Sequence, residues 1–374
     1  MKTLILLLII LLISCTKQEK QTECPTITFD ISQKVTLNRK DIECKFIALE
    51  TNDKCLLRAI VDIHFYDNKI FIIDGIKNSK VFIFDNQGKF ISQIGDIGSG
   101  PGEYAQPYRM HIDKKNNQII IADTRLNKLI HYRLDNFKYI SDQKAFNFSD
   151  CAWLPDGNIL WFNIIGFDTG KRKNYFIQIT DKELNTITYH GETQELPPYC
   201  IGEQTLFQFN EETYIAYPFT SVVYQVTSND IQERFKLSFG VQEMPSSEYF
   251  INLFKENGAS GPDIMLRSDY INSFNVFETN NYIATSYFSK NFESYLGFYN
   301  KHTKETNALS CKEFSRLFEL PNASFIRKAI DNSFIMQLNA KEIANKQSSY
   351  KELNEISNKL TEESNPILCL FKFN

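Results

Sequence analysis

Residues 59 to 94 decide the fold class, and they read AIVDIHFYDNKIFIIDGIKNSKVFIFDNQGKFISQI. Polar breaks divide this stretch into four apolar runs, at residues 59–66, 70–74, 81–85 and 89–94. Asp67-Asn68 separates the first two runs, and Asn and Asp tolerate the left-handed backbone that tight hairpin turns need. Short apolar runs bounded by turn residues are typical of strands. The stretch therefore predicts a small antiparallel sheet.

This unit recurs five more times along the chain. Each copy has an apolar strand, a tight turn rich in Asn, Asp or Gly, a second apolar strand, and then further strands after a polar break. The second strands begin at Ile70, Ile119, Ile159, Tyr214, Tyr282 and Phe334. Three or four antiparallel strands in each repeat, with repeats spaced as these second strands are, are typical of β-propeller blades. We therefore predict an all-β fold, a single six-bladed β-propeller over residues 43–374.

The last unit lacks a fourth strand, and residues 43–50 form a spare strand before the first unit. We predict that residues 43–50 close the ring as the outermost strand of the last blade, because closure removes an open sheet edge. Residues 245–258 and 348–361 break the β pattern. Their apolar residues follow helical spacing, which predicts two small helical insertions.

The N-terminal residues carry a targeting signal. Lys2 precedes an apolar run at residues 4–13, which is too short for a membrane-spanning helix and is typical of a signal peptide. The run ends in Leu12-Ile13-Ser14-Cys15, which resembles the bacterial lipobox. We expect removal of residues 1–14, lipidation of Cys15, and a tether and lead-in over residues 15–42. The alternative is an ordinary signal peptide with a chance cysteine. The expected location is the cell envelope, as an outer-membrane lipoprotein on the periplasmic or surface side.

Composition narrows the function classes. The 41 basic and 45 acidic residues give a net charge of −4, which argues against nucleic acid as a partner. The 31 Phe and 18 Tyr fit packing between blades. Five aromatic residues are candidates for sugar stacking if they are exposed: Trp153, Trp161, Tyr104, Tyr108 and Tyr199. Seven cysteines follow Cys15 and match no zinc pattern. We interpret Cys151 and Cys369, which lie in apolar runs, as buried thiols.

Several segments carry a family likeness. Residues 46–51, 67–70, 81–85, 88–91 and 94–104 resemble the secreted six-bladed β-propeller lipoproteins that are related to NHL-repeat propellers and widespread in Gram-negative gut anaerobes. The C-terminal helix and the strand after it are also similar to this family. The resemblance implies the propeller fold. It implies no defined activity, because a propeller hosts many chemistries.

Polar residues cluster on the predicted innermost strands, where propellers usually bind ligands. We name as ligand-binding candidates Arg58, Asp62, His64, Glu103, Tyr104, Arg109, His111 and Arg125. Arg58, Arg109 and Arg125 are a candidate anion-binding rim, and internal ion pairs are the structural alternative. The Gly-rich loop 95–104 is not a phosphate loop, since Pro101 interrupts it and no helix follows. We interpret the loop as a blade connection, with lining of the ligand funnel as the alternative, and Asp74 and Asp123 as turn caps.

No catalytic set emerges from the five scattered histidines, and no nucleophile or metal-binding spacing is present. We therefore expect no cofactor, although an axial calcium or zinc with one ligand per blade stays open. The first hypothesis is a lipid-anchored, monomeric binding module for a glycan fragment, a peptide or an envelope protein. Its membrane contact runs through the lipid. The alternatives are a lyase or lactonase with an axial divalent metal, and a non-catalytic scaffold in an envelope complex.

Overall fold

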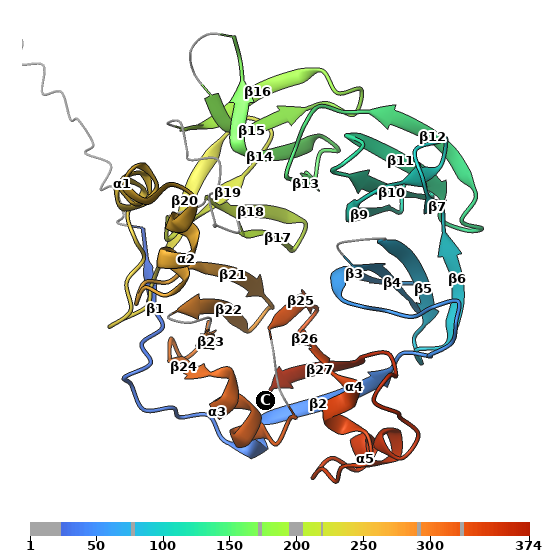
Figure 1. Ribbon diagram of the computed structural model, residues 1–374, viewed down its shortest axis with the longest axis vertical. Coiled ribbons are helices and arrows are strands. Elements are labelled where there is room, and N and C mark those ends of the chain that lie inside the picture. Colours follow the sequence, from blue (N-terminus) through green and yellow to red (C-terminus); the bar gives the residue numbers. More distant parts are fainter. Residues whose placement is uncertain are drawn as a thin grey trace, which may run out of the picture.

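The computed structural model describes residues 24–75, 79–170, 174–193, 205–217, 220–289, 293–321 and 325–374. Six antiparallel sheets stand around a common axis as the blades of a ring (Figure 1). Each blade runs from an innermost strand near the axis to an outermost strand at the rim. The prediction of an all-β, six-bladed propeller is confirmed.

Blades one to three each contain four strands in chain order. Blade one is β3 (Ile60–Tyr66), β4 (Lys69–Asp74), β5 (Lys80–Asp85) and β6 (Phe90–Ile94). Blade two is β9 (Pro107–Asp113), β10 (Gln118–Asp123), β11 (Lys128–Arg133) and β12 (Tyr139–Lys144). Blade three is β13 (Asp150–Trp153), β14 (Ile159–Asp168), β15 (Asn174–Thr180) and β16 (Thr186–Thr193). The short pair β7 (Asp96–Ile97) and β8 (Glu103–Tyr104) connects blades one and two.

Blades four to six follow the same plan. Blade four is β17 (Thr205–Phe209), β18 (Glu212–Ala216), β19 (Val222–Val226) and β20 (Ile231–Ser238). Blade five is β21 (Ser273–Glu278), β22 (Tyr282–Ser289), β23 (Glu293–Asn300) and β24 (Thr306–Ser310). Blade six is β25 (Ile326–Ile330), β26 (Ser333–Leu338), β27 (Ile367–Phe373) and, as its outermost strand, β2 (Ile42–Ala48).

The predicted closure of the ring is confirmed. Strand β2 pairs antiparallel with β27 along its whole length and places Phe46 opposite Cys369. Buried Asn365 joins this closure to the segment that leads from β2 into blade one, because its amide nitrogen donates to the carbonyls of Glu50 and Cys55, each at 2.6 Å. The two ends of the chain thus complete one sheet.

The N-terminal lead-in packs against the ring from residue 24 onward, which the sequence interpretation did not anticipate. Strand β1 (Thr26–Thr28) adds in parallel to β20 at the outer edge of blade four. Phe29 is fully buried against Gly297 of blade five, where a Cβ atom would lie 2.5 Å from the Phe29 ring. The backbone N–H of Thr36 donates to the Asn307 side chain at 2.7 Å. We call residues 24–41 the N-terminal strap.

The predicted helical insertions are present as α1 (Ser247–Asn257), which Ser246 caps, and α5 (Lys351–Ser357). Several short helices were not predicted: η1 (Arg39–Asp41), η2 (Gly258–Ser260), α2 (Gly261–Leu266), α3 (Cys311–Phe318) and α4 (Ala340–Ile343). A capping box of Ser310 and Glu313 starts α3, and the helix buries Phe314 and Phe318 against blades five and six. Within the described ranges, no helix is long and apolar enough to cross a membrane.

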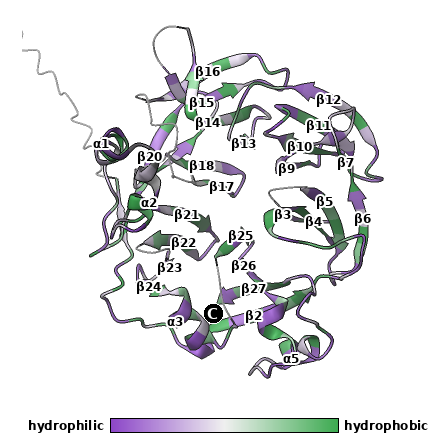
Figure 2. Cartoon of the chain, in the orientation of Figure 1, coloured by the Kyte–Doolittle hydropathy of each residue, from purple (hydrophilic) through white to green (hydrophobic). Residues whose placement is uncertain are grey.

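The core consists of apolar layers between neighbouring blades. Phe71 and Ile73 of blade one pack with Met110 and Ile121 of blade two, and similar clusters fill the other junctions. Figure 2 shows hydrophobic residues concentrated within the blades and hydrophilic residues along outer strands such as β12. Cys151 and Cys369 are buried free thiols as predicted, whereas Cys15 and Cys200 lie outside the described residues.

Candidate binding site at the axis of the ring

Strand register makes positions comparable around the axis. In blades one, two and three, the apolar stretch of the second strand begins at Ile70, Ile119 and Ile159. Asp62, Arg109 and Asp150, on the innermost strands of these three blades, each lie opposite the fourth residue of that stretch. Two residues further along, His64 and His111 occupy one equivalent position in blades one and two, and Lys328 occupies it in blade six. Side chains alternate between the two faces of a strand, so residues two positions apart share one face. These side chains therefore face a neighbouring blade near the axis.

Asp62 joins three blades. Its carboxylate is almost fully buried and accepts the backbone N–H groups of Ile63 and Met110, each at 3.0 Å. It also lies 2.9 Å from Nε2 of His64 and 3.3 Å from Nζ of Lys328. Blade six, blade one and blade two therefore meet at one carboxylate.

The charges around Asp62 set its protonation state. Burial raises the pKa of the Asp62 carboxyl, but the hydrogen bond from His64 and the positive charges of Lys328 and Arg109 outweigh burial and hold this pKa well below its usual range. Burial lowers the pKa of His64, so its imidazole is neutral near pH 7. Near pH 7 the positive charges beside Asp62 are therefore those of Lys328 and Arg109. Neutral His64 donates its Nε2–H to Asp62, which leaves Nδ1 as an acceptor.

Blades two and three meet through a buried ion pair and a ring stack. Arg109 donates through Nε and Nη2 to the fully buried carboxylate of Asp150, at 2.5 and 2.6 Å. The rings of His111 and Trp153 stack with centroids 4.6 Å apart and planes 7° apart. Burial, assisted by His64, lowers the pKa of His111 to about 4. His111 is therefore also neutral near pH 7.

The other half of the ring presents apolar groups at the same level. By register, the position of His64 holds Ala152 in blade three, Phe207 in blade four and Phe277 in blade five. Phe207 and Phe277 are partly exposed. The position of His64 is therefore polar in blades six, one and two and apolar in blades three, four and five. Phe207 and Phe277 also pack against the cores of their blade junctions.

The structure brings four predicted site residues together, namely Asp62, His64, Arg109 and His111. Arg58 and Arg125 are exposed near the ends of strands β3 and β10, and their backbone N–H groups bond to Asp74 and Asp123. The buried Asp123 caps the turn after β10 as predicted, because its carboxylate also accepts the N–H of Leu126. The buried Asp74 instead accepts the N–H groups of Arg58 and Ala59 at the start of blade one. The proposed anion rim loses Arg109, because Asp150 already binds its guanidinium.

Glu103 and Tyr104 do not belong to this group. Tyr104 is fully buried, its hydroxyl donates to the carbonyl of Ile94 at 2.9 Å, and burial raises its pKa. The Glu103 carboxylate accepts the backbone N–H of Gly100 at 2.7 Å. The Gly-rich loop is therefore a tightly bonded connection between blades, and Tyr104 is a packing residue.

The aromatic candidates for sugar stacking are mostly inside the protein. Trp161 and Tyr104 have no exposed surface, and Trp153 is 8% exposed with one face against His111. Tyr108 is partly exposed and lies 5.2 Å from the Arg109 guanidinium. Tyr199 lies outside the described residues.

Sequence reasoning missed Asp150, Lys328 and the stacking role of Trp153. A count back from each hairpin turn would have found the first two, because blade register repeats. Within the described part of the chain, no group of three or more His, Cys, Asp or Glu side chains is placed to hold a metal ion.

Comparisons with known proteins agree with the architecture. A family model described as a 6-bladed beta-propeller matches residues 16–337. A crystal structure from Bacteroides fragilis, of a protein whose name predicts export, superposes with a TM-score of 0.85 at 26% identity, over 93% of this chain and 99% of that one. A DUF4221-family structure from Bacteroides vulgatus, at 10% identity and a TM-score of 0.55, covers 90% of this chain and 100% of that one, and supports the fold alone.

Two of the curated proteins that match this chain do so over a short segment. The peptidylglycine alpha-amidating monooxygenases of Mus musculus and Rattus norvegicus are 29% and 26% identical to this chain over 83 residues. The segment is 21% of this chain and 8% of either monooxygenase.

Proposed function

We propose that this chain, which belongs to the DUF5128 family of six-bladed β-propellers, is a lipid-anchored envelope protein that binds a small ligand at the axis of the ring. The observation that carries the proposal is the pair of neutral histidines at the axis. Nδ1 of His64 and both ring nitrogens of His111 have no hydrogen-bond partner among the described residues. The His64 side chain is 22% exposed, so solvent or a ligand reaches it.

The charges at the axis restrict the class of ligand. Asp62 is paired with Lys328 and Asp150 with Arg109, so the two carboxylates and the two cations neutralise each other. A ligand at this level therefore meets hydrogen-bonding groups on one side and Phe207 and Phe277 on the other. We propose an uncharged ligand with one polar and one apolar face, such as a glycan fragment or a short peptide.

The anchor and the location are part of the same proposal. The signal-like residues 1–14 and Cys15 support export and lipidation. The B. fragilis protein, whose name predicts export, supports the same location. We further propose that the protein is a monomer, that it binds no cofactor and that it catalyses no reaction.

The proposal is tested by ligand-observed NMR with uncharged oligosaccharides and dipeptides. We expect at least one ligand whose signal is lost in His64→Ala and His111→Ala and retained in His302→Ala, which changes an exposed histidine of blade five. If His64→Ala and His111→Ala both leave ligand binding unchanged, the proposed site is wrong. A stoichiometric metal in elemental analysis, removed by the same substitutions, would replace the proposal with the metal-dependent enzyme.

A further inference from the structure

Two cysteine side chains meet on the sheet that closes the ring. Cys44 lies on β2 and Cys369 on β27, which run side by side in blade six (Figure 1). Cys44 is opposite Phe371 and Cys369 is opposite Phe46, so the two cysteines are diagonal neighbours. Opposed residues share one face of a sheet, and so do residues two apart on a strand. Both cysteines therefore pack in the apolar cluster between blades five and six.

Hydrogen bonds connect the two thiols to each other and to the start of α5. The Cys369 thiol donates to Sγ of Cys44. The Cys44 thiol donates to the hydroxyl of Tyr350, the residue before α5, at 3.4 Å, and this hydroxyl donates to the carbonyl of Phe318 at 2.8 Å. The two sulfur atoms are therefore within hydrogen-bonding reach of each other in the folded chain.

The two thiols differ in exposure and in acidity. Cys44 is partly exposed, whereas Cys369 has no exposed surface. The hydrogen bond from Cys369 and the positive charge of Arg39, whose guanidinium lies 4.1 Å from the centroid of the Tyr350 ring, lower the pKa of Cys44. Burial raises the pKa of Cys369. The thiolate is the nucleophile in thiol–disulfide exchange, so Cys44 reacts first and Cys369 second.

We infer that Cys44 and Cys369 form a reversible disulfide that locks the ring. The Cys44 thiolate attacks a small-molecule or protein disulfide of the envelope, and the displaced sulfur takes up the proton that Cys44 released. Cys369 then attacks Sγ of Cys44, and the second external sulfur leaves with the Cys369 proton. Two thiols are thereby oxidised to one disulfide, and the external disulfide is reduced to two thiols. The reaction rests on the proposed envelope location, because that compartment is oxidising.

The diagonal arrangement makes the bond reversible. Diagonal neighbours in an antiparallel pair have Cα atoms about 7–8 Å apart, whereas disulfides usually span about 4.4–6.8 Å. Strand β2 is the outermost strand of blade six, so it can approach β27 by about an ångström without meeting a further strand of that sheet. A disulfide that forms in this way is strained, and strained disulfides are reduced more easily than relaxed ones.

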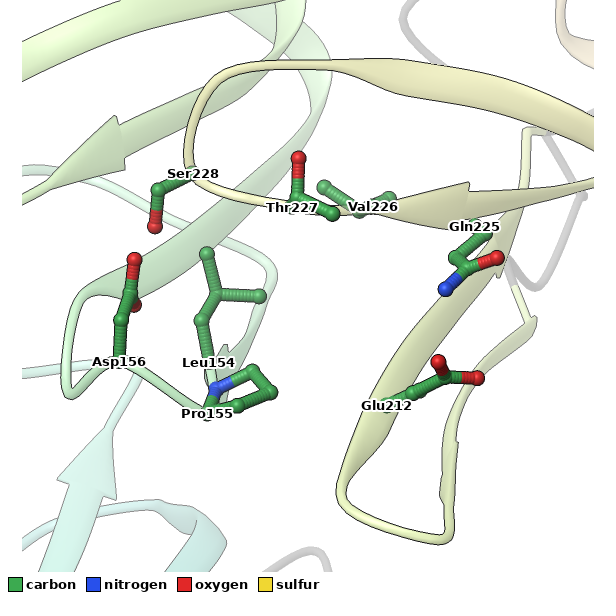
Figure 3. A pocket seen from close by; sticks show the side chains of 8 residues that line it. All are labelled: Leu154, Pro155, Asp156, Glu212, Gln225, Val226, Thr227 and Ser228. Carbon is green, nitrogen blue, oxygen red and sulfur yellow. The ribbon is translucent and has the colours of Figure 1, made fainter.

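The bond lies where the two ends of the chain meet. Blade six combines β2 with the C-terminal strands, so non-covalent pairing alone joins β2 to β27 when the thiols are reduced. Blades three and four, by contrast, follow each other along the chain. The pocket of about 210 Å³ between their turns has no cysteine among its eight lining residues (Figure 3). There the Asn158 amide donates across the junction to the Ser228 hydroxyl at 2.9 Å.

The inference is tested on the intact mature chain, fully reduced, with oxidised glutathione as the probe. Remaining thiols are alkylated, and the disulfide is located by intact mass and peptide mapping. We expect the folded chain to lose two hydrogens and to link the peptides of Cys44 and Cys369, with no lasting glutathione adduct. The linked chain should migrate faster in a non-reducing denaturing gel, because the bond closes most of the chain into a loop. Excess reduced glutathione should reverse both changes.

Two variants separate the roles of the two thiols. Cys44→Ser should form neither the link nor an adduct on this sheet, because the nucleophile is absent. Cys369→Ala should keep one glutathione on Cys44, because no second thiol resolves the mixed disulfide. The matched control is Cys311→Ala, which removes another buried free thiol of the same cluster and should oxidise as the parent does.

Three results would each overturn the inference. They are a stable glutathione adduct on Cys44 of the parent, a link from Cys44 to any other cysteine, and a link to Cys369 that forms only in denaturant. None of these results depends on where the protein is located. Lipidation of Cys15 tests the location separately, so failure of the thiol pair and failure of the proposed location are distinguishable.

Discussion

Arg109 of blade two binds Asp150 of blade three through two parallel hydrogen bonds, at 2.5 and 2.6 Å, on adjacent innermost strands. Asp150 has no exposed surface, so the guanidinium is its counter-charge in an environment that excludes water. Two planar charged groups in this arrangement fix the spacing of the two strands as well as their charge. The junction between these blades therefore depends on both partners.

Replacing Arg109 alone should destabilise the ring strongly. Arg109→Met leaves the Asp150 carboxylate buried without a counter-charge, and we expect the free energy of unfolding to fall by about 3–5 kcal/mol. Denaturant titration followed by tryptophan fluorescence measures this, since Trp153 stacks on the neighbouring His111.

The double variant Arg109→Met with Asp150→Leu should recover most of that loss, because an apolar pair replaces a desolvated ionic one. Arg133→Met is the matched control and removes the arginine of an exposed pair with Asp135 on a blade-two turn. We expect no measurable change there. If Arg109→Met behaves like Arg133→Met, the pair does not hold the junction.

The N-terminal strap should depend on the contact between Phe29 and Gly297. Phe29→Ala removes a fully buried ring, so we expect a loss of about 3–5 kcal/mol in stability. Gly297→Ala should release the strap in the same way, since its Cβ would collide with the ring. Limited proteolysis checks both, with faster cleavage within residues 24–41. Thr28→Ala, at an exposed position of β1, should leave the cleavage rate unchanged.

The sequence predicts those features of the structure whose interacting residues lie close together along the chain. The tight turns at Asp67-Asn68 and Asn210-Glu211 are local, and the left-handed φ values of Asp67, Asn68 and Asn210 follow from residue type. They therefore reveal the blades and, through register, the innermost strands. The capping box at Ser310 and Glu313 is also local and would have revealed α3.

Contacts between distant residues were not predictable in the same way. Strand β1 has only three residues, and its parallel partner β20 follows about 200 residues later. Nothing local in Asp150 or Lys328 indicates that each binds a charge on another blade.

Lipidation of Cys15 is the prediction that concerns the chain outside the ring. In a Gram-negative host, the mature protein should begin at Cys15 and carry a diacylglyceryl group, and it should fractionate with membranes. Cys15→Ser should abolish the modification and leave the precursor uncleaved. Cys24→Ser, a partly exposed free cysteine beside β1, is the control and should be lipidated normally. Intact-mass spectrometry decides the matter, and an unmodified N-terminus beyond residue 14 would contradict the prediction.

The pH dependence of stability should contain a contribution from His111. Its pKa is lowered to about 4 in the folded chain, whereas an unfolded histidine titrates near 6.5. Between these values the unfolded chain binds a proton that the folded chain does not, so stability falls as pH falls through this window. The loss should approach about 3 kcal/mol by pH 4. His111→Phe retains a ring against Trp153 and removes the titration. Its free energy of unfolding should therefore fall less between pH 6.5 and 4 than that of the parent, whereas His302→Gln should follow the parent. Parallel curves for His111→Phe and the parent would show that His111 protonates equally easily in both states.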